Sequence, residues 1–391
     1  MQHVLDSASA GFRVEAVEWE ADCITLKEMR QGIFGWVRLS CLIAVVALFS
    51  GTDRVLLAAV QPHPANWGLQ RINQSPPPPD SQFRHGADGT GVDVYIIDNG
   101  VLLTNEDFGG RGQSVADMTV GNFYGSTTDN PVTSDVSPCP GSDGYDGHGT
   151  HNASYAVGAT YGVARKARLH ALKVTGAKCQ GDINASIHAF NWIRQRVTQH
   201  GQRPGVINYS FWAYQGAGDP AAGRLQAAIL GAIDAGFVVT LSAGCRKDGP
   251  AGWGPVATQQ TSGALIVAST NASDGTGVRG PGPEDYGSLL TLFAPGIGVV
   301  GAGSSSDSDA SAQPADGTCG DSFAAPHVAG VAAVYLQQHP GATPAQVRAA
   351  ILDRAAIVPG LPKKMLQMAR DSGAAQSHAD TLARRLESAP G

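Results

Sequence analysis

The chain has 391 residues, of which 42% are hydrophobic, and its formal net charge is −6 at pH 7. This length and composition allow a large buried core and exclude disordered, fibrous and coiled-coil proteins. The acidic balance, with no basic cluster longer than RKAR at 165–168, argues against nucleic acid as a partner.

Near its N-terminus the chain has the features of an export signal. An apolar run at 39–51 follows Arg30 and Arg38 and is too short for an ordinary membrane span. We therefore predict a signal peptide at 29–59. A buried core helix is the weaker alternative, because charged residues interrupt the segment after residue 52. The expected localisation is secreted, extracellular or periplasmic, without stable membrane association.

The first 28 residues do not fit an export signal. They carry several acids, whereas the start of such a signal is positively charged. Translation is therefore expected to begin at Met29, with 1–28 as a mis-assigned extension. The domain that follows is expected to span 60–369, and 370–391 to be a solvated tail.

Strand-like and helix-like segments alternate beyond the proline-rich turn at 74–80. Continuous apolar runs bounded by turn residues predict buried strands at 91–98, 168–174, 205–211, 237–244 and 264–270. Apolar residues at helical spacing predict helices within 182–197 and 223–236. This alternation predicts an α/β fold, with a doubly wound, mostly parallel sheet flanked by helices on both faces. The polar segment 111–146 lacks periodicity and is expected to be a surface insertion.

The cysteines permit two disulfides in an exported chain. If Cys23 and Cys41 lie in removed sequence, four cysteines remain: Cys139, Cys179, Cys245 and Cys319. Three pairings are then open, and the sequence does not choose among them.

Three polar residues are expected at the carboxyl ends of the strands, where doubly wound sheets bind their ligands. Asp98 ends the first buried strand, His148 is flanked by glycines, and Ser322 begins a helix of small residues. Singly, each has an ordinary structural explanation: an Asx turn, a structural histidine and a helix N-cap. Together they supply a nucleophile, a general base and a carboxylate that orients the base. The N-terminus of the Ser322 helix would also stabilise a developing oxyanion.

A metal-dependent hydrolase is a weaker hypothesis. His148 and His151 are three residues apart rather than in a His-Glu-x-x-His helix, and the cysteines are scattered. No metal site is therefore expected.

The surroundings of these residues resemble the subtilisin-like serine peptidases, in particular their proteinase K and aqualysin branch. The resemblance rests on NWGLQRINQ at 66–74, VYIIDNGV, GHGTHNASYAVG, VINYSFWA, FVVTLSAG, LLTLFAPG and GDSFAAPHVAG. It implies a subtilisin-like fold and a monomeric, secreted serine endopeptidase that hydrolyses polypeptides through an acyl-enzyme intermediate.

The resemblance also implies roles for individual residues. It places Asp98, His148 and Ser322 on the catalytic triad, and His151 and His327 on structural helix positions. The residues implied to bind substrate are Ser210, Phe211 and Trp212 on a strand that pairs with it, and Ser242, Ala243 and Gly244 on the wall of the primary specificity pocket. The aqualysin-like disulfide would join Cys139 to Cys179.

Two departures from the family bear on the chemistry directly. Cys245 stands where the family has the asparagine that donates to the oxyanion, and a thiol is a weak donor. The same cysteine could instead pair with Cys319 and constrain the site. Asp321 replaces the threonine before the nucleophile and would put a negative charge beside the oxyanion.

Other departures concern the substrate groove, calcium and processing. Trp212 replaces a glycine of the groove. The resemblance makes calcium a possible cofactor, but Thr291 replaces the aspartate that binds structural calcium, so no calcium is expected at that position and a calcium site elsewhere stays open. The segment between Gly51 and Trp67 is too short for an inhibitory pro-domain. The alternative function is therefore a catalytically weak or inactive relative that binds peptides or a partner protein.

Overall fold

The computed structural model describes residues 59–62, 64–73, 82–117, 147–175, 181–200, 204–210, 220–244, 263–276, 289–314 and 320–368. The expected signal peptide up to residue 58, the proline-rich turn and the C-terminal tail lie outside the described residues. Among the described helices, none combines the length and the apolar character needed to cross a membrane.

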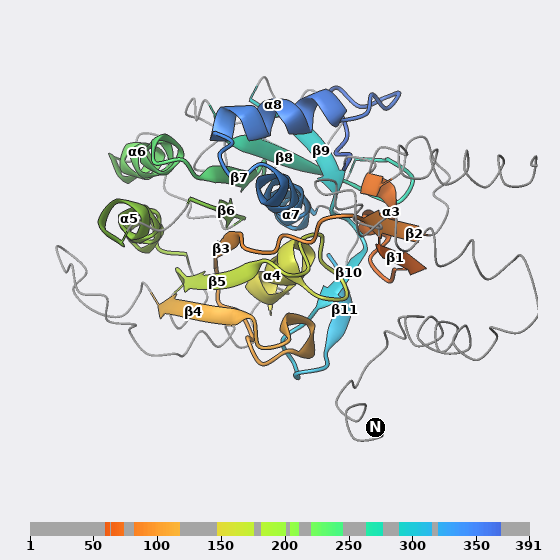
Figure 1. The fold of residues 1–391 in the computed structure, drawn as a ribbon, viewed down its shortest axis with the longest axis horizontal. Helices are drawn as coiled ribbons and strands as arrows, with labels where there is room; N and C mark the ends of the chain where they lie inside the picture. The colour runs from red at the N-terminus through yellow and green to blue at the C-terminus, as the bar shows by residue number, and fades with distance from the viewer. Residues whose placement is uncertain are drawn as a thin grey trace, which may run out of the picture. The chain divides into compact units, whose positions relative to one another are not determined.

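A seven-stranded sheet runs through the centre of the structure, in the order β4-β5-β3-β6-β7-β8-β9 (Figure 1). Every neighbouring pair in it is parallel. The strands are β3 (Asp93–Asp98), β4 (Gly112–Asp117), β5 (Arg168–Lys173), β6 (Val206–Tyr209), β7 (Val238–Ser242), β8 (Leu265–Thr270) and β9 (Leu292–Pro295). The prediction of a doubly wound, mostly parallel α/β sheet is confirmed.

One strand corrects a prediction made from the sequence. The segment 111–146 was expected to be a surface insertion throughout, but β4 occupies its start and pairs with β5 at the edge of the sheet. β4 has a single neighbour in the sheet, and its sequence GQSVAD lacks the continuous apolar run of the central strands. Residues 118–146 lie outside the described part of the chain.

Helices cover both faces of the sheet. They are α3 (Trp67–Asn73), α4 (His148–Val157), α5 (Ile183–His200), α6 (Pro220–Asp234), α7 (Asp321–Gln338) and α8 (Pro344–Arg354), with a 3-10 turn η1 (Glu106–Phe108). Two antiparallel pairs complete the described elements: β1 (Ala59–Pro62) with β2 (Gln82–His85), and β10 (Val299–Ala302) with β11 (Ala310–Gln313). Figure 1 shows α5 and α6 side by side, and α4 and α7 near the centre.

The central strand β3 explains how both faces are filled. Successive side chains of a strand point to opposite faces, and all six residues of β3 are buried. Val94 and Ile96 belong to the core formed with α4, α7 and α8, whereas Tyr95 and Ile97 belong to the core formed with α5 and α6. The uninterrupted apolar run of this strand is the consequence of burial on both sides.

The order of the strands reverses at β3. The chain passes from β3 to β4 and β5 on one side of it, and then to β6 through β9 on the other. In such sheets the crevice outside the carboxyl ends of the strands at this switch point is where ligands bind. Asp98 is the last residue of β3 and therefore lies at this point.

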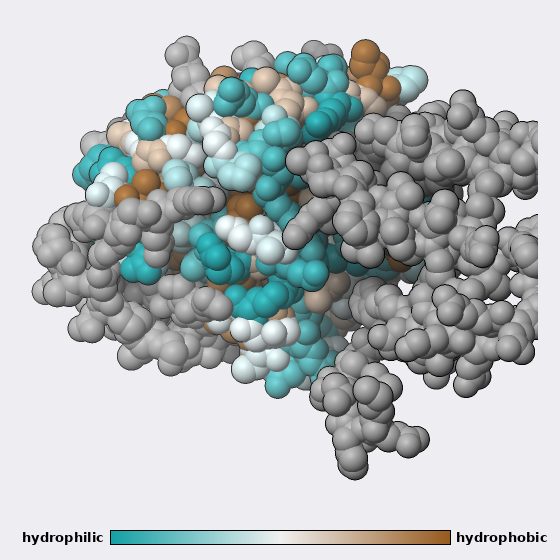
Figure 2. Space-filling view, viewed as in Figure 1, coloured by the Kyte–Doolittle hydropathy of each residue, from teal (hydrophilic) through white to brown (hydrophobic). Residues whose placement is uncertain are grey.

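The surface drawn in Figure 2 mixes polar and apolar residues, and hydrophobic residues occur there in small separate spots. Among the described residues, the exposed large hydrophobic side chains are Val60 and Ile357. Scattered single residues of this kind are normal for a protein surface and indicate no docking site.

Candidate active site

Asp98 and His148 form a buried pair at the end of β3. The Nδ1 atom of His148 lies 2.7 Å from Oδ1 of Asp98, and the histidine is 6% exposed. A carboxylate accepts only, so Nδ1 carries the proton of the neutral ring and Nε2 is its basic nitrogen. Asp98 also accepts from the backbone N–H of Asn99 at 2.7 Å and from the amide of Asn152 at 2.8 Å. These bonds fix the carboxylate that orients His148.

The glycines on either side of His148 are required by close backbone contacts. Gly147 is the N-cap of α4 and adopts φ 71°, a left-handed conformation that favours glycine. A Cβ on Gly149 would lie 2.2 Å from the carbonyl oxygen of Gly100, so any larger residue would push α4 away from β3. The Gly149 N–H instead donates to Asn99 Oδ1 at 2.9 Å. The sequence GHG therefore holds the first turn of α4 against the end of β3.

Ser322 is the second residue of α7, whose N-cap is Gly320. The interpretation of Ser322 as the N-cap is therefore wrong. Its half-buried hydroxyl donates to the carbonyl oxygen of Ser210 at 3.1 Å. The ring of the next residue, Phe323, lies 5.2 Å from the ring of His148, measured between centroids. The structure thus brings the start of α7 beside the Asp98–His148 pair.

The residues expected to bind substrate follow the ends of two neighbouring strands. Ser210 comes directly after β6, and its hydroxyl donates to the carbonyl oxygen of Ser322 at 2.7 Å. Ser242 ends β7, with Ala243 partly exposed and Gly244 exposed just beyond it. These positions lie at the same sheet edge as Asp98. Phe211, Trp212, Cys245, Cys139, Cys179 and Cys319 lie outside the described residues.

Asp321 was expected to place a negative charge beside the oxyanion, and the structure differs from that expectation. Its side chain is fully buried, and Oδ1 accepts from the backbone N–H of Ser269 at 2.8 Å and from the Ser269 hydroxyl at 2.7 Å. Burial raises the pKa of Asp321 to about 7, against the effect of the two hydrogen bonds. The carboxyl group therefore contacts β8 in surroundings that disfavour its charge.

His151 and His327 are buried on the helices that carry the site. His151 Nδ1 donates to the carbonyl oxygen of Gly147 at 3.0 Å, and its Nε2 lies 3.1 Å from the Ser311 hydroxyl. Burial lowers the pKa of each histidine to about 4, so both are neutral at pH 7. Their contacts are structural, in line with the positions that the resemblance implied.

His327 also connects α7 to the turn before α3. Asn66 Nδ2 donates to His327 Nε2 at 3.0 Å, so His327 Nδ1 carries the proton and donates to the carbonyl oxygen of Phe323 at 2.9 Å. The ring of Tyr155 on α4 stacks on this imidazole with centroids 5.1 Å apart. One neutral histidine therefore ties three segments together beneath the first turns of α4 and α7.

This arrangement predicts a loss of stability in acid. The folded pKa of His327 lies near 4 and the unfolded value near 6.5, so the unfolded chain binds more protons between these values. Neutral His327 contributes its full share to the free energy of unfolding above pH 6.5. As the pH falls to 4, that free energy falls by roughly 3 kcal/mol. Urea unfolding at pH 7 and pH 4 should show a smaller loss in the free energy of unfolding for His327→Gln than for the parent.

The matched control is His339→Gln, because His339 is exposed at the end of the same helix. This change should leave the pH dependence of the free energy of unfolding as in the parent. Equal losses for the parent and His327→Gln would show that protonation of His327 is not coupled to unfolding.

Comparison with known proteins identifies the family. The sequence model of the Subtilase family (Peptidase_S8) matches residues 89–381, more than half of the chain. The chain belongs to the subtilase family. The recognition made from the triad contexts is confirmed.

Characterised subtilases resemble this one over about three quarters of its length. An extracellular serine proteinase of Thermus sp. (strain Rt41A) is 34% identical over 78% of this chain and 65% of its own. The alkaline serine exoprotease A of Vibrio alginolyticus is 32% identical over 78% of this chain and 49% of its own. The chain thus spans about half to two thirds of the length of these relatives.

A solved structure agrees with the fold. The crystal structure of a cold-adapted subtilisin-like serine proteinase matches with a TM-score of 0.62 and 31% identity, covering 78% of this chain and 98% of that one. The parallel sheet with helices on both faces is therefore a subtilisin-like fold.

Thr291 does not suit the calcium position of this subtilase. Its hydroxyl accepts from the backbone N–H of Ile266 at 3.1 Å, and its own N–H donates to the carbonyl oxygen of Ile266 at 2.9 Å. The side chain thus closes the β8–β9 ladder with a neutral group, whereas Ca²⁺ prefers carboxylate oxygens. Among the described residues, no group of three or more His, Cys, Asp and Glu side chains is arranged to hold a metal ion.

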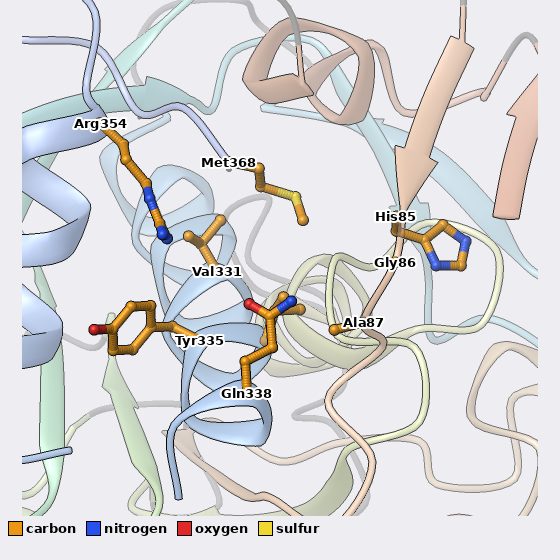
Figure 3. A pocket seen from close by; sticks show the side chains of 9 residues that line it. His85, Gly86, Ala87, Val331, Tyr335, Gln338, Arg354 and Met368 are labelled. Atoms are coloured by element: carbon orange, nitrogen blue, oxygen red, sulfur yellow. The ribbon is translucent and has the colours of Figure 1, made fainter. Parts of the chain in front are cut away.

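A small depression elsewhere on the subtilase is not part of this site. Figure 3 shows the residues around it, which lie on α7, at the end of α8, after α8 and at the end of β2: Tyr335, Gln338, Arg354, Met368 and His85. Its volume is about 20 Å³, which is room for a water molecule rather than a peptide. Tyr335 lies 13 residues after Ser322 on the same helix, roughly 20 Å away along its axis.

The sequence analysis missed two asparagines of this site. Asn152 is four residues after His148 on α4, so the two share one helix face, and its amide reaches Asp98. That spacing could have revealed it. Asn99 was interpreted only as part of a turn, although its side chain accepts from Gly149.

Proposed function

We propose that this subtilase is a secreted serine endopeptidase that uses Asp98, His148 and Ser322 as a catalytic triad. The observation that carries the proposal is the 2.7 Å contact between His148 Nδ1 and Asp98 Oδ1 beside the first turn of α7. The names of its relatives, which are called serine proteinases and exoproteases, support the same activity.

In the proposed first step, Ser322 Oγ attacks the carbonyl carbon of a peptide bond. His148 Nε2 takes the hydroxyl proton and then gives it to the leaving amine, while Asp98 stabilises the imidazolium. The C–N bond breaks, and an ester between Ser322 and the acyl part of the substrate remains.

In the second step, water replaces the leaving amine. His148 takes one proton from the water, the resulting hydroxide attacks the ester carbon, and the Ser322 oxygen leaves and recovers a proton from His148. The products are a carboxylic acid, which releases its proton to solvent to become the carboxylate, and the original enzyme. No metal or cofactor takes part, and we propose that calcium does not bind at Thr291.

Both steps create an oxyanion that needs donors. The backbone N–H of Ser322 lies in the first turn of α7, where N–H groups lack acceptors within the helix and the positive end of the dipole lies. Cys245 would supply the second donor, and its thiol is a weak one. We assign substrate binding to Ser210, Phe211 and Trp212 on one side and to Ser242, Ala243 and Gly244 on the other.

Export is part of the same proposal. The apolar run at 39–51 and the word extracellular in the name of the Thermus relative support a secreted enzyme. A disulfide between Cys139 and Cys179 would suit that environment.

The proposal is tested by labelling the purified protein with a fluorophosphonate, which reacts only with activated serines. Mass mapping should place the label on the peptide that contains Ser322. The labelling is run with and without reductant, because a bond between Cys245 and Cys319 would block the site until it is reduced.

The labelling distinguishes the proposed triad from the alternative function. Label on another serine would contradict the triad. No label in either condition, on a protein whose circular dichroism shows it folded, would favour the alternative of an inactive relative that binds peptides or a partner protein.

A separate prediction concerns Cys245. Replacing it by asparagine should raise kcat, because an asparagine amide is the stronger oxyanion donor and such a donor is worth about 10²–10³ in turnover in subtilisin. The change is measured with a chromogenic peptide.

Cys245→Ala is the matched control for this change, because it removes the thiol without adding a donor. A gain in both variants would mean that the thiol was locked or inhibitory. A gain in neither would mean that another group completes the oxyanion site.

A further inference from the structure

A buried acid precedes the proposed nucleophile. Asp321 is the first residue of α7, has no exposed surface and bonds through Oδ1 to both the N–H and the hydroxyl of Ser269. Ser269 belongs to β8, so the side chain of Asp321 joins the first turn of α7 to the carboxyl end of that strand.

The Ser269 hydroxyl completes a small ring of hydrogen bonds. It donates to Asp321 Oδ1 at 2.7 Å and accepts from the N–H of Gly320 at 3.1 Å. The backbone of Gly320 also lies against that of Gly296, because a Cβ on Gly320 would come 1.8 Å from the Gly296 carbonyl oxygen. Two residues before Ser322, the chain is thus held from the side of β8 and from the loop after β9.

The second oxygen of the carboxyl group has no such partner. Among the described residues, Asp321 Oδ2 is fully buried and makes no hydrogen bond. A buried carboxylate with one oxygen unpaired is strongly disfavoured, whereas a protonated carboxyl keeps Oδ1 as an acceptor and carries its proton on Oδ2. The geometry therefore fits the neutral acid better than the anion.

We propose that Asp321 is a positioning residue whose neutral carboxyl group fixes the turn carrying Ser322 against β8, and that ionisation of this group lowers the reactivity of Ser322. The second part rests on the proposed role of Ser322 as the nucleophile.

The surroundings support titration of this group near neutral pH. Burial raises the pKa of Asp321 to about 7, and no charged neighbour contributes to the shift. The contacting strands β8 and β9 and the loop at 296–298 contain no ionisable side chain. Other elements packed against this half of α7, and α7 itself, contribute these described ionisable groups: Asp98, His148, His151, Tyr155, Tyr209 and His327.

Asp321→Asn distinguishes ionisation of Asp321 from ionisation of these other groups. Asparagine keeps an oxygen that accepts from Ser269 and mimics the protonated acid, but it does not titrate. Rates of fluorophosphonate labelling are measured from pH 5 to pH 9.5 and normalised for each protein to its own rate at pH 6. Above pH 7 the normalised rate of the variant should exceed that of the parent, by up to about tenfold per pH unit.

The matched control is Asp353→Asn, the same chemical change at an exposed position of α8. Its normalised profile should superimpose on that of the parent. Profiles of Asp321→Asn and the parent that superimpose would overturn the link between Asp321 and Ser322.

A second measurement is independent of activity. In the Ser322→Ala background, an acid whose folded pKa is raised stabilises the fold below pH 3.8, and this contribution is lost as pH rises through 7. The Tm of Asp321→Asn relative to its parent should therefore increase between pH 4 and pH 8. A constant difference would show that Asp321 is not a buried neutral acid.

The two measurements keep the proposals distinguishable. If the parent is not labelled at any pH, the assignment of Ser322 fails while the Tm series still tests the state of Asp321. Ser269→Ala provides a further check, because it removes the hydroxyl donor to Asp321 without a titratable group. Because that hydrogen bond lowers the pKa of Asp321, the change should slow labelling and move the fall of the normalised rate to higher pH.

Discussion

Replacing Ser322 by alanine is expected to lower the rate of peptide hydrolysis by about 10⁶-fold, the effect of removing the nucleophile of subtilisin. The loss should fall on kcat, because the hydroxyl oxygen forms the acyl-enzyme and nothing else in the proposed mechanism replaces it. The measurement is hydrolysis of a chromogenic peptide under saturating conditions.

The fold should survive this change. The Ser322 hydroxyl is half-buried and donates one hydrogen bond, to the Ser210 carbonyl oxygen at 3.1 Å, so its removal should cost about 1 kcal/mol or less. Ser308→Ala, at an exposed position of the loop between β10 and β11, is the control and should hydrolyse as the parent does. A folded Ser322→Ala protein with parental activity would show that another residue is the nucleophile.

Replacing Asp98 by asparagine is the second large effect, with an expected loss in kcat of about 10⁴-fold. The carboxylate is buried against His148 Nδ1 at 2.7 Å and holds both the proton on that nitrogen and the charge of the imidazolium. An amide oxygen in the Oδ1 position would keep the bond to His148 but not the negative charge.

The structure indicates how this variant would be accommodated. The new amide nitrogen would replace Oδ2, where Asn152 Nδ2 donates at 2.8 Å, and two donors would face each other. Asn152 Oδ1 makes no hydrogen bond with the described residues, so rotation of that amide by 180° would restore an acceptor. We therefore expect Asp98→Asn to fold, and its loss of activity to come from the lost negative charge beside the imidazolium.

Asp234→Asn, the same change at an exposed position near the end of α6, is the control for this variant and should retain parental activity. Circular dichroism and Tm confirm folding of both proteins. A folded Asp98→Asn protein within tenfold of the parent would contradict the assignment of Asp98 as the residue that orients His148.

Much of the framework could be predicted from the sequence because it depends on local pattern. The run at 93–98 is apolar at every position before Asp98 except its first, and a short run of this kind bounded by glycines and turn residues is typical of a strand buried on both faces. Asp98, His148 and Ser322 were predicted from residue types at the ends of strands and the starts of helices. The conformation of such segments and the burial of their side chains both follow from the local pattern of apolar and polar residues.

The position of β4 could not be predicted in this way. An edge strand pairs on one side only, and GQSVAD has no apolar run that distinguishes it from a polar loop. The pairing with β5, which lies more than 50 residues later in the sequence, decides its conformation.

The sequence by itself determined the family, the parallel α/β fold class and the central strands of the sheet, and it supplied the residues that we propose as the triad. Only the tertiary structure decided that the Asp321 carboxyl group contacts Ser269, which precedes it by 52 residues. It likewise decided that Asn152 supports Asp98 and that His327 binds Asn66, 261 residues away. Hydrogen bonds between residues so distant depend on how the helices pack on the sheet, and the burial that sets the pKa of Asp321 near 7 exists only once they have packed.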